Sequence, residues 1–307
     1  MNLQQLRYLN EIVRQGLNIS GAAETLFTSQ PGISKQIKQL EEELGIEIFV
    51  RNGKRIVAIT EPGKAVLSIA QRMLHDVDNL KQVGQEFCAQ DTGLLTIATT
   101  HTQARYALPP VVKQFMKRYP KVKLGLHQGS PTQIAEQVLG GDADLGIATE
   151  SLSLYDGLIT LPCYEWNHCV ITLPHHPLLK EKQITLETLA QYPIITYDFA
   201  FTGRSKINEA FQKAGITPNI ALTMMDADVI KTYVELGMGI GIVARMSFVS
   251  ERDKHLRMVE VAHLFKSSTT RIATRKNEYL RAYAYDFIEL FAPHLTRQVV
   301  VDANQSS

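Results

Sequence analysis

The chain has 307 residues, of which 45% are hydrophobic and 21% are charged. Because a domain typically holds about 100–200 residues, this length predicts two or three packed units. The hydrophobic content excludes a disordered or fibrous protein. The 32 Lys and Arg residues nearly balance the 31 Asp and Glu residues, which gives a net charge of +1. This balance excludes a uniformly basic coat protein for nucleic acid, so any DNA-binding surface must be local.

The cysteine content and the hydropathy pattern bear on the compartment. The chain has three cysteines, at positions 88, 163 and 169. This small, odd number argues against a disulfide scaffold and favours a reducing environment. The first residues lack the apolar core of a signal peptide, and no apolar run approaches the roughly 20 residues of a membrane span. We therefore expect a soluble cytoplasmic protein without membrane contact.

The first 60 residues predict three short helices. Apolar residues recur at helical steps after Leu3 and again over Ala22–Leu26. A third helix is expected after Ser29, whose hydroxyl can cap it, with Pro31 in its first turn and Gly45 at its end. Small residues in the second helix allow close crossing, so the segment is typical of a helix-turn-helix.

The segment FVRNGKRIVAIT follows the third helix and predicts a hairpin. Its Asn52-Gly53 pair between alternating apolar residues is a strong turn signal, and the basic residues beside that turn make a wing suited to the DNA backbone or minor groove. The outward face of the third helix alone fits a solvated surface as well as it fits a DNA contact, but helix and wing together favour DNA binding. We expect base readout from Gln30, Pro31 and Ser34, and phosphate contacts from Lys35, Lys38, Arg51, Lys54 and Arg55.

A long helix is predicted after the wing, because Thr60 can cap its start and Pro62 fits its first turn. Its apolar residues recur three or four apart, namely Val66, Ile69, Met73, Val77, Leu80, Val83 and Phe87. So narrow a stripe favours a seam between two copies of the helix, centred on Met73, Val77 and Leu80. Packing on its own domain is the alternative. A dimer would present two DNA-binding domains to a two-fold symmetric operator.

The polar stretch 88–92 marks a boundary, so we expect a winged helix-turn-helix domain at 1–60, a linker and dimerisation helix at 61–90 and an effector domain at 91–307. In the effector domain, strand and helix patterns alternate as in a parallel open sheet. The expected strands are 94–99, 122–126, 144–148, 169–173, 194–197, 220–223, 240–243 and 270–274, and the expected helices are 107–119, 131–139, 205–214, 227–236 and 280–291. The sequence leaves open which lobe the last strand joins. Its return to the first lobe gives an α/β fold like that of periplasmic binding proteins, with lobe I at about 91–162 and 267–307 and lobe II at about 163–266.

Hydroxyl-rich loops follow several predicted strands. In open parallel sheets ligands bind at the carboxyl ends of strands, where the next helix begins. Thr99–Gln103 lies at such a point, and its neutral donors beside a helix dipole suit an oxyanion. The segments 129–132 and 202–205 and the strand end at Thr149 have the same character. Ordinary helix capping is the alternative, but convergence on one cleft favours an anion site.

Catalysis and metal binding are not predicted. The cleft segments contain neither Gly-x-Ser-x-Gly nor a His pair at metal-binding spacing. His101 is the one obvious base, no activating carboxylate is visible beside it, and Asp226 and Asp228 are expected to cap a helix. Cys163 and Cys169 lack the spacing of a zinc knuckle. We expect no catalytic residue, metal or cofactor.

Long ungapped strings carry a family resemblance. The run AAETLFTSQPGISKQIKQLEEELGIEIFVR and the later ITEPG resemble the DNA-binding head of LysR-type transcriptional regulators. The strings ATTHTQARYALP, HQGSPTQIAE, DADVIKTY, FTGRS and YDFIELFAPHLTR resemble the CysB branch of that family. This resemblance implies control of sulfur assimilation and cysteine biosynthesis genes, with N-acetylserine, O-acetylserine or sulfate as the effector. It also implies that the anion ligands are Thr100, Thr102, Gln103, Thr149 and Thr202. The loop chemistry adds Ser130 and Arg204, although Arg204 equally fits a surface or interlobe role.

The expected partners are double-stranded promoter DNA, a small anionic effector and a second copy of the chain. A homotetramer rests on the resemblance alone, and RNA polymerase is left open as a partner. The nearest alternative is a LysR-type regulator of sulfonate or other sulfur sources with a different effector. An alternative of another class is a cytosolic anion-binding protein that does not bind DNA.

Overall fold

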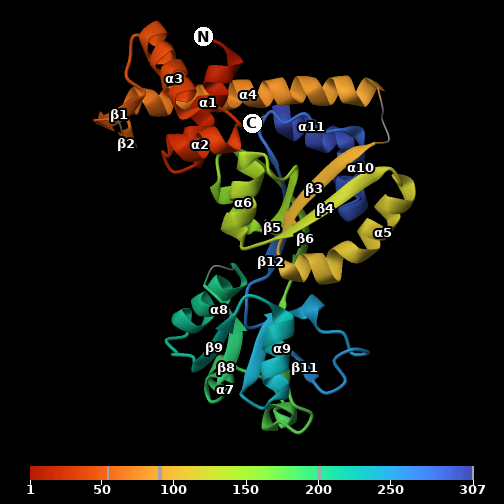
Figure 1. Ribbon diagram of the computed structural model, residues 1–307. Coiled ribbons are helices and arrows are strands. Elements are labelled where there is room, and N and C mark those ends of the chain that lie inside the picture. Colours follow the sequence, from red (N-terminus) through yellow and green to blue (C-terminus); the bar gives the residue numbers. More distant parts are fainter. Residues whose placement is uncertain (54, 89–91, 200–201, 306–307) are drawn as a thin grey trace. The chain divides into compact units, whose positions relative to one another are not determined.

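The computed structural model describes residues 1–53, 55–88, 92–199 and 202–305 (Figure 1). The chain divides into two compact units, Met1–Cys88 and Ala89–Ser307. The first unit carries a two-stranded hairpin among helices, and the second carries two five-stranded sheets. No described helix is both long enough and apolar enough to cross a membrane.

The first unit begins with three short helices, each started by a side-chain cap. Asn2, Asn18 and Ser29 accept hydrogen bonds from backbone N–H groups in the first turns. Gly45 ends the third helix in the left-handed conformation that favours glycine, at φ +67°. The elements are α1 (Leu3–Arg14), α2 (Ile19–Thr25), α3 (Gln30–Leu44), β1 (Phe49–Asn52) and β2 (Arg55–Ile59). The predicted helices and hairpin are confirmed.

The long helix α4 (Glu61–Cys88) is also confirmed, and its two ends differ in environment. In its first half Ala70 is buried, and Val66, Leu67 and Leu74 pack against the core of the head. That half therefore packs on its own unit, which corrects the expectation that Val66 belongs to an intermolecular seam. Farther along, Leu80 is 71% exposed.

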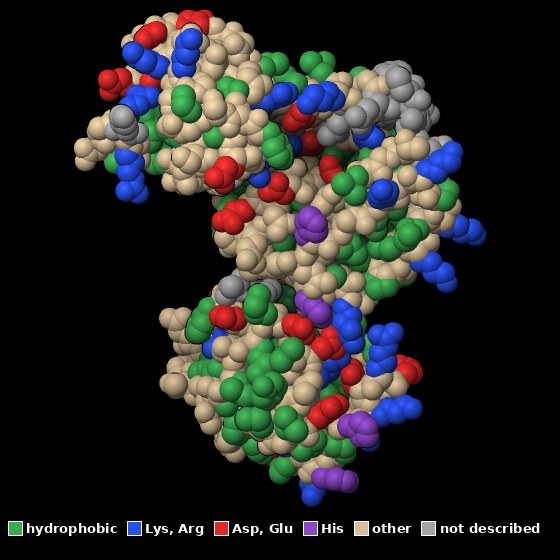
Figure 2. Space-filling model, viewed as in Figure 1, with side chains coloured by type: hydrophobic (Ala, Val, Ile, Leu, Met, Phe, Trp, Pro, Cys, Tyr) green, Lys and Arg blue, Asp and Glu red, His purple; other side chains and the backbone are tan. Residues whose placement is uncertain are grey.

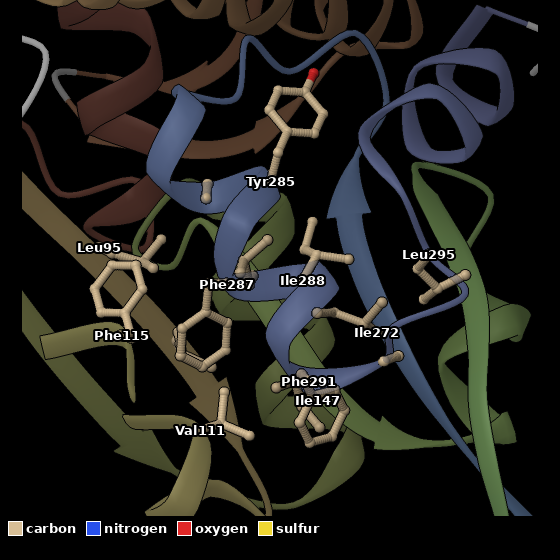
Figure 3. Close-up of a cluster of buried hydrophobic side chains, with 14 of the residues drawn as sticks. Leu95, Val111, Phe115, Ile147, Ile272, Tyr285, Phe287, Ile288, Phe291 and Leu295 are labelled. Atoms are coloured by element: carbon tan, nitrogen blue, oxygen red, sulfur yellow. The ribbon is translucent and has the colours of Figure 1, made fainter. Parts of the chain in front are cut away.

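Lobe I of the second unit is a sheet of order β4-β3-β5-β12-β6. Its strands are β3 (Gly93–Thr99), β4 (Val122–Gln128), β5 (Leu145–Thr149), β6 (Leu158–Trp166) and β12 (Ser268–Arg275). Its helices are α5 (Leu108–Arg118), α6 (Pro131–Gly140), α10 (Ala282–Phe291) and α11 (Arg297–Gln305). Figure 3 shows α10 packed over this sheet, where Phe287 meets Phe115 edge to face with ring centroids 5.4 Å apart.

Lobe II is a second sheet, of order β11-β7-β10-β8-β9. Its strands are β7 (His168–Thr172), β8 (Ile194–Tyr197), β9 (Ile220–Met224), β10 (Ile240–Ala244) and β11 (Arg257–Glu260). Its helices are α7 (Leu186–Ala190), α8 (Thr202–Lys213) and α9 (Ala227–Glu235). Apolar side chains such as Ile207, Phe211 and Phe265 fill the core of this lobe.

Both sheets are mixed, whereas the sequence pattern predicted parallel strands. In each lobe three strands run parallel, and two more join them in antiparallel ladders, β12 and β6 in lobe I and β7 and β11 in lobe II. Strands β6 and β11 and helices α7 and α11 were not predicted. The last strand does return to lobe I. The chain crosses between the lobes after Trp166 and before Ser268, so the predicted lobe limit at 162/163 falls inside β6.

Candidate nucleic-acid interface and effector site

Helix α3 has one buried face and one exposed face. Ile33, Ile37 and Leu40 are buried in the core of the first unit, and Lys35, Lys38 and Gln39 on the opposite face are exposed. Gln30 and Lys35 are exposed, and the Gln30 amide donates a hydrogen bond to the Ser34 hydroxyl at 3.2 Å. The outer side chains thus follow one surface of the helix, as base and phosphate contacts require. Figure 2 shows Lys and Arg side chains around α3 and the wing.

Arg51 has a role in the fold that the sequence analysis missed. Its guanidinium makes two hydrogen bonds to the Glu41 carboxylate, at 3.1 and 2.7 Å. Glu41 is buried and also accepts from the backbone N–H groups of Ile48 and Phe49, at 2.9 and 3.2 Å. The ion pair therefore holds the wing against α3. Of the other predicted wing contacts, Arg55 is exposed and Lys54 lies outside the described residues.

A small cavity lies between the lobes of the second unit. The register that pairs Thr99 with Ile147 brings the carboxyl ends of β3 and β5 together. The accessible space is about 40 Å³, and since a buried water needs about 10–15 Å³, it suits a small oxyanion or a few waters. The residues around it are Thr100, His101, Thr102, Gln103, Pro131 and Thr149 from lobe I, with Trp166, Tyr197, Gly203, Met225, Ala244 and Met246.

Four of the predicted anion ligands thus border the cavity. The hydroxyl-bearing Thr100 and Thr149 are buried, at 8% and 9% exposure. Gln103 is held in place, because the Tyr164 hydroxyl donates to its amide oxygen and its amide nitrogen donates to Thr270 at 3.0 Å. The amide nitrogen of Gln103 also donates to Met246 Sδ at 3.9 Å, and an anion would replace this weak sulfur acceptor. The donors are neutral, and the first turn of a helix that begins at residue 101 adds backbone N–H groups.

The remaining predicted ligands do not border this cavity among the described residues. Ser130 caps α6 by accepting from the backbone N–H of Gln133 at 3.3 Å. Arg204 is buried within lobe II and donates to Asn208 at 2.7 Å and to the carbonyl of Tyr197 at 3.3 Å. It therefore positions the segment before α8. The side chain of Thr202 lies outside the described residues.

Two aromatic residues at the cavity were missed by the sequence analysis. Trp166 is the one tryptophan of the chain, and its buried indole N–H has no hydrogen-bond partner among the described residues. Tyr197 accepts a hydrogen bond from the backbone N–H of Ala244 at 3.0 Å, and burial raises the pKa of its hydroxyl. The single Trp lies three residues before the predicted strand 169–173, and this signal could have been used.

His101 does have carboxylates beside it, which corrects the sequence analysis. Its Nε2 lies 3.4 Å from Asp226 and 3.5 Å from Asp228, both at the start of α9. Asp226 caps α9 as predicted, by accepting from the N–H groups of Asp228 and Val229. These three side chains are the one described group of three whose ligand atoms lie close enough to hold a metal ion. Asp228, however, already pairs with Arg105 at 2.6 Å.

The chain matches known families over both units. Residues 3–64 match the bacterial regulatory helix-turn-helix proteins of the lysR family, and residues 89–296 match the LysR substrate binding domain. The HTH-type transcriptional regulator SsuR of Burkholderia cenocepacia is 57% identical over 96% of both chains. The regulator CysB of the same organism is 54% identical over 99% of this chain and 97% of that relative.

Solved structures of LysR-type regulators have the same fold as this chain. The cofactor-binding domain of the Cbl transcriptional regulator matches 70% of this chain and 95% of its own, with 41% identity and a TM-score of 0.68. A full-length OxyR variant from Pseudomonas aeruginosa matches 97% of this chain and 98% of its own at 21% identity and a TM-score of 0.68, which shows the shared fold. The predicted fold class is confirmed, and these relatives are transcriptional regulators and not enzymes. The chain therefore belongs to the LysR family of bacterial transcriptional regulators.

Proposed function

We propose that this protein is a sequence-specific DNA-binding regulator of sulfur assimilation and cysteine biosynthesis genes, controlled by a small sulfur-linked anion. The observation that carries the proposal is the cavity lined by Thr100, Thr102, Gln103 and Thr149, in a chain 54% identical to a CysB regulator. The helix-wing surface of the other unit supplies the DNA-binding half of the proposal.

DNA recognition would use α3 in the major groove and the wing beside it. Gln30, Pro31 and Ser34 lie at the start of α3, where a recognition helix contacts base edges. Lys35 and Lys38 are exposed on the same helix and would neutralise phosphates. Arg51 would act chiefly by orienting the wing, because its guanidinium is bound to Glu41.

The effector would be an anion held by neutral donors. Hydroxyl and amide groups around the cavity can surround a tetrahedral oxyanion, and each such bond to a charged group contributes about 1.5–3 kcal/mol. The cavity volume suits sulfate, whereas O-acetylserine or N-acetylserine would require the lobes to move apart. A ligand that contacts both lobes favours their closure, because its bonds differ between open and closed forms. The related Cbl protein has a domain described as cofactor-binding, which supports a ligand here.

Self-association would place two heads on one operator. Met73 and Leu80 of α4 are exposed at 37% and 71% although both are apolar, and a second copy of α4 would cover them. LysR-type regulators bind promoter DNA and form oligomers, and we extend this to a homodimer through α4 and a homotetramer. Contact with RNA polymerase would follow if the protein activates transcription.

Regulation of sulfonate or other sulfur sources, with a different effector, is the nearest alternative. Titration calorimetry of the full-length protein with sulfate, O-acetylserine and N-acetylserine separates the effectors. Thr100→Val and Thr149→Val should weaken binding of the true effector at least about tenfold, since each removes a bond to the anion. Thr188→Val, away from the cavity in α7, is the matched control. Parental affinity in both cavity variants would place the effector elsewhere.

A further inference from the structure

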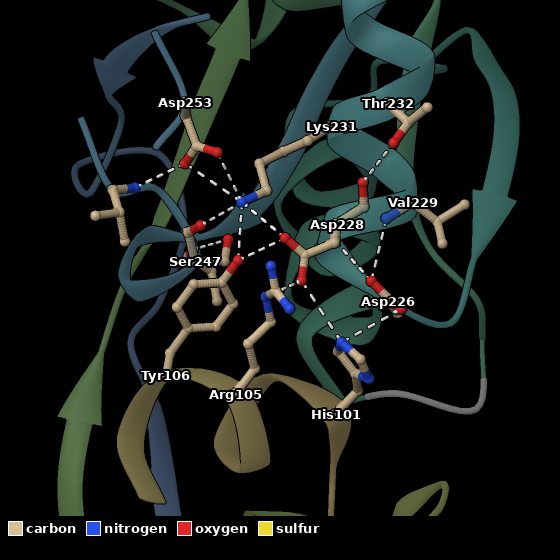
Figure 4. Close-up of polar contacts among 12 residues, drawn as sticks. His101, Arg105, Tyr106, Asp226, Asp228, Val229, Lys231, Thr232, Ser247 and Asp253 are labelled. Carbon is tan, nitrogen blue, oxygen red and sulfur yellow. Dashed lines mark hydrogen bonds and ion pairs between the residues drawn. The ribbon is translucent and has the colours of Figure 1, made fainter. Parts of the chain in front are cut away.

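Two consecutive residues of lobe I bind one carboxylate of lobe II (Figure 4). Arg105 Nε lies 2.6 Å from Asp228 Oδ2, and the Tyr106 hydroxyl donates to Asp228 Oδ1 at 2.7 Å. Burial opposes the charge of Asp228, but the bonds from Tyr106 and Lys231 outweigh it and lower the pKa of this carboxyl. Asp228 is therefore charged at neutral pH and binds the facing lobe through both of its oxygens.

Lys231 holds Asp228 in place from within lobe II. It is 6% exposed, and its ammonium lies 2.9 Å from Asp228, 3.0 Å from Asp253 and 2.9 Å from the carbonyl of Ser247. It also donates to the Tyr106 hydroxyl at 2.8 Å. Burial disfavours this charge, yet the bonds to Tyr106, Asp228 and Asp253 raise the pKa of Lys231. Lys231 keeps its partners in lobe II when Tyr106 moves away.

Local sequence places these groups. Pro109 and Pro110 lack N–H groups, so the turn before them cannot complete α-helical hydrogen bonds and adopts a π-helical form over Gln103–Ala107. Arg105 and Tyr106 lie in that turn. On the other side, Asp226 caps α9, which leaves the side chain of Asp228 available to the facing lobe.

We propose that Arg105, Tyr106 and Asp228 form an interlobe latch that favours the closed cleft before any effector binds and so sets effector affinity. This inference rests on the proposed function, since it concerns the same cleft. None of the three borders the cavity among the described residues, so the latch acts without contacting the ligand. Apparent affinity is proportional to the fraction of molecules in the closed, binding-competent state, so weakening the latch weakens binding.

A bound metal ion is the competing explanation for the cluster, because His101, Asp226 and Asp228 lie close together. A cation there would have to compete with Arg105 and Lys231, which already neutralise Asp228. The latch therefore predicts that EDTA leaves the apo cleft closed. Opening of the parent cleft by EDTA would overturn the proposal.

The chain contains a matched control for the latch. Arg118 and Tyr119 also form a consecutive pair that binds one carboxylate, Asp286, with Arg118 Nη2 2.8 Å from Asp286 Oδ2. In both pairs the guanidinium carbon lies 5.7 Å from the centre of the neighbouring tyrosine ring. All three control residues belong to lobe I, so they bridge no cleft.

The experiment compares full-length Arg105→Gln/Tyr106→Phe with full-length Arg118→Gln/Tyr119→Phe. Spin labels at Leu154→Cys in lobe I and Leu236→Cys in lobe II, both exposed, report the interlobe distance in a Cys88→Ser background. Without ligand, the latch variant should show a longer and broader distance distribution than the parent, and the control variant should not. Calorimetry with sulfate should show about three- to tenfold weaker binding in the latch variant only.

The interlobe distance without ligand, and not the melting temperature, separates a latch from a merely structural contact. An unchanged apo distance in the latch variant overturns the proposal, whatever its melting temperature. Asp228→Asn, which preserves the size of the side chain, should reproduce the opening and the weaker binding. If the parent binds no sulfate, the proposed effector fails, while the apo distances alone still decide whether the latch exists.

Discussion

Arg51 in the wing and Glu41 in α3 form a two-point ion pair, with Arg51 Nη2 2.7 Å from Glu41 Oε2. Because Glu41 also accepts from two backbone N–H groups at the start of β1, one carboxylate joins the recognition helix to the wing. The angle between α3 and the wing, the two elements proposed to contact DNA, is therefore fixed within the folded first unit.

Arg51 and Arg55 should differ when each is replaced by glutamine. Arg51→Gln leaves Glu41 buried without its cation and should destabilise the head by about 1–3 kcal/mol, as measured by denaturant unfolding. Arg55→Gln should leave stability unchanged and reduce the slope of log affinity against log salt by about 0.9, as expected for one lost phosphate contact. Equal stability of the two variants would contradict the structural role of Arg51.

A charged substitution on α4 tests the proposed dimer interface. Leu80→Glu places a carboxylate where a second α4 should bury an apolar side chain, so sedimentation should show weaker self-association and DNA binding should fall. Leu154→Glu, at an exposed leucine of lobe I, is the control. An oligomeric state identical to that of the parent would exclude this face of α4.

The sequence predicted what short-range chemistry determines. Ser29 and Gly45 delimit α3, and Asn52-Gly53 lies at the turn of the hairpin, because caps and turns depend on adjacent residues. Strand β6 was missed because it pairs with β12, which lies more than a hundred residues later.

Ion pairs between distant residues were missed for the same reason. Asp228 looked like a helix-capping residue from sequence alone, and its contact with Arg105 exists only once the lobes face each other. The threonines of the cavity were found because they follow strands, whereas Trp166 reaches the cavity through the crossover, which sequence spacing does not reveal.

Two glycines of α4 should respond oppositely to alanine. A Cβ at Gly63 would lie 2.2 Å from the carbonyl oxygen of Ile48, so Gly63→Ala should destabilise the head by about 1–3 kcal/mol. Among the described residues, no atom outside the backbone of the neighbouring helical turns lies within 4 Å of a Cβ at Gly84, so Gly84→Ala should stabilise the helix by about 0.5–1 kcal/mol. Chemical unfolding followed by circular dichroism measures both, and a tolerated Gly63→Ala would contradict the packing of α4 on the hairpin.

His168 should make lobe II sensitive to acid. Burial lowers its pKa to about 4, in a site between Trp166 and Phe265, while an unfolded histidine titrates near 6.5. Between these values the unfolded chain binds the proton and the folded chain does not, so stability falls as pH drops from about 6.5 to 4, by about 3 kcal/mol in total.

His168→Phe should remove this part of the pH dependence of unfolding, and His175→Gln, at an exposed histidine of the same lobe, should not. A pH profile of His168→Phe with the parental slope between pH 4 and 6.5 would show that other groups cause the acid sensitivity.

The central claim is that an anion in the cleft changes how the head binds DNA. Its most direct test is fluorescence anisotropy of the full-length protein on promoter DNA of a sulfur-assimilation operon and on a scrambled duplex, with and without sulfate, O-acetylserine or N-acetylserine. We expect preference for the promoter, a change in affinity with one effector of about 5- to 150-fold, and a response in Thr149→Val that needs at least about tenfold more of it. Equal binding to both duplexes, or an unchanged effector response in Thr149→Val, would contradict the account.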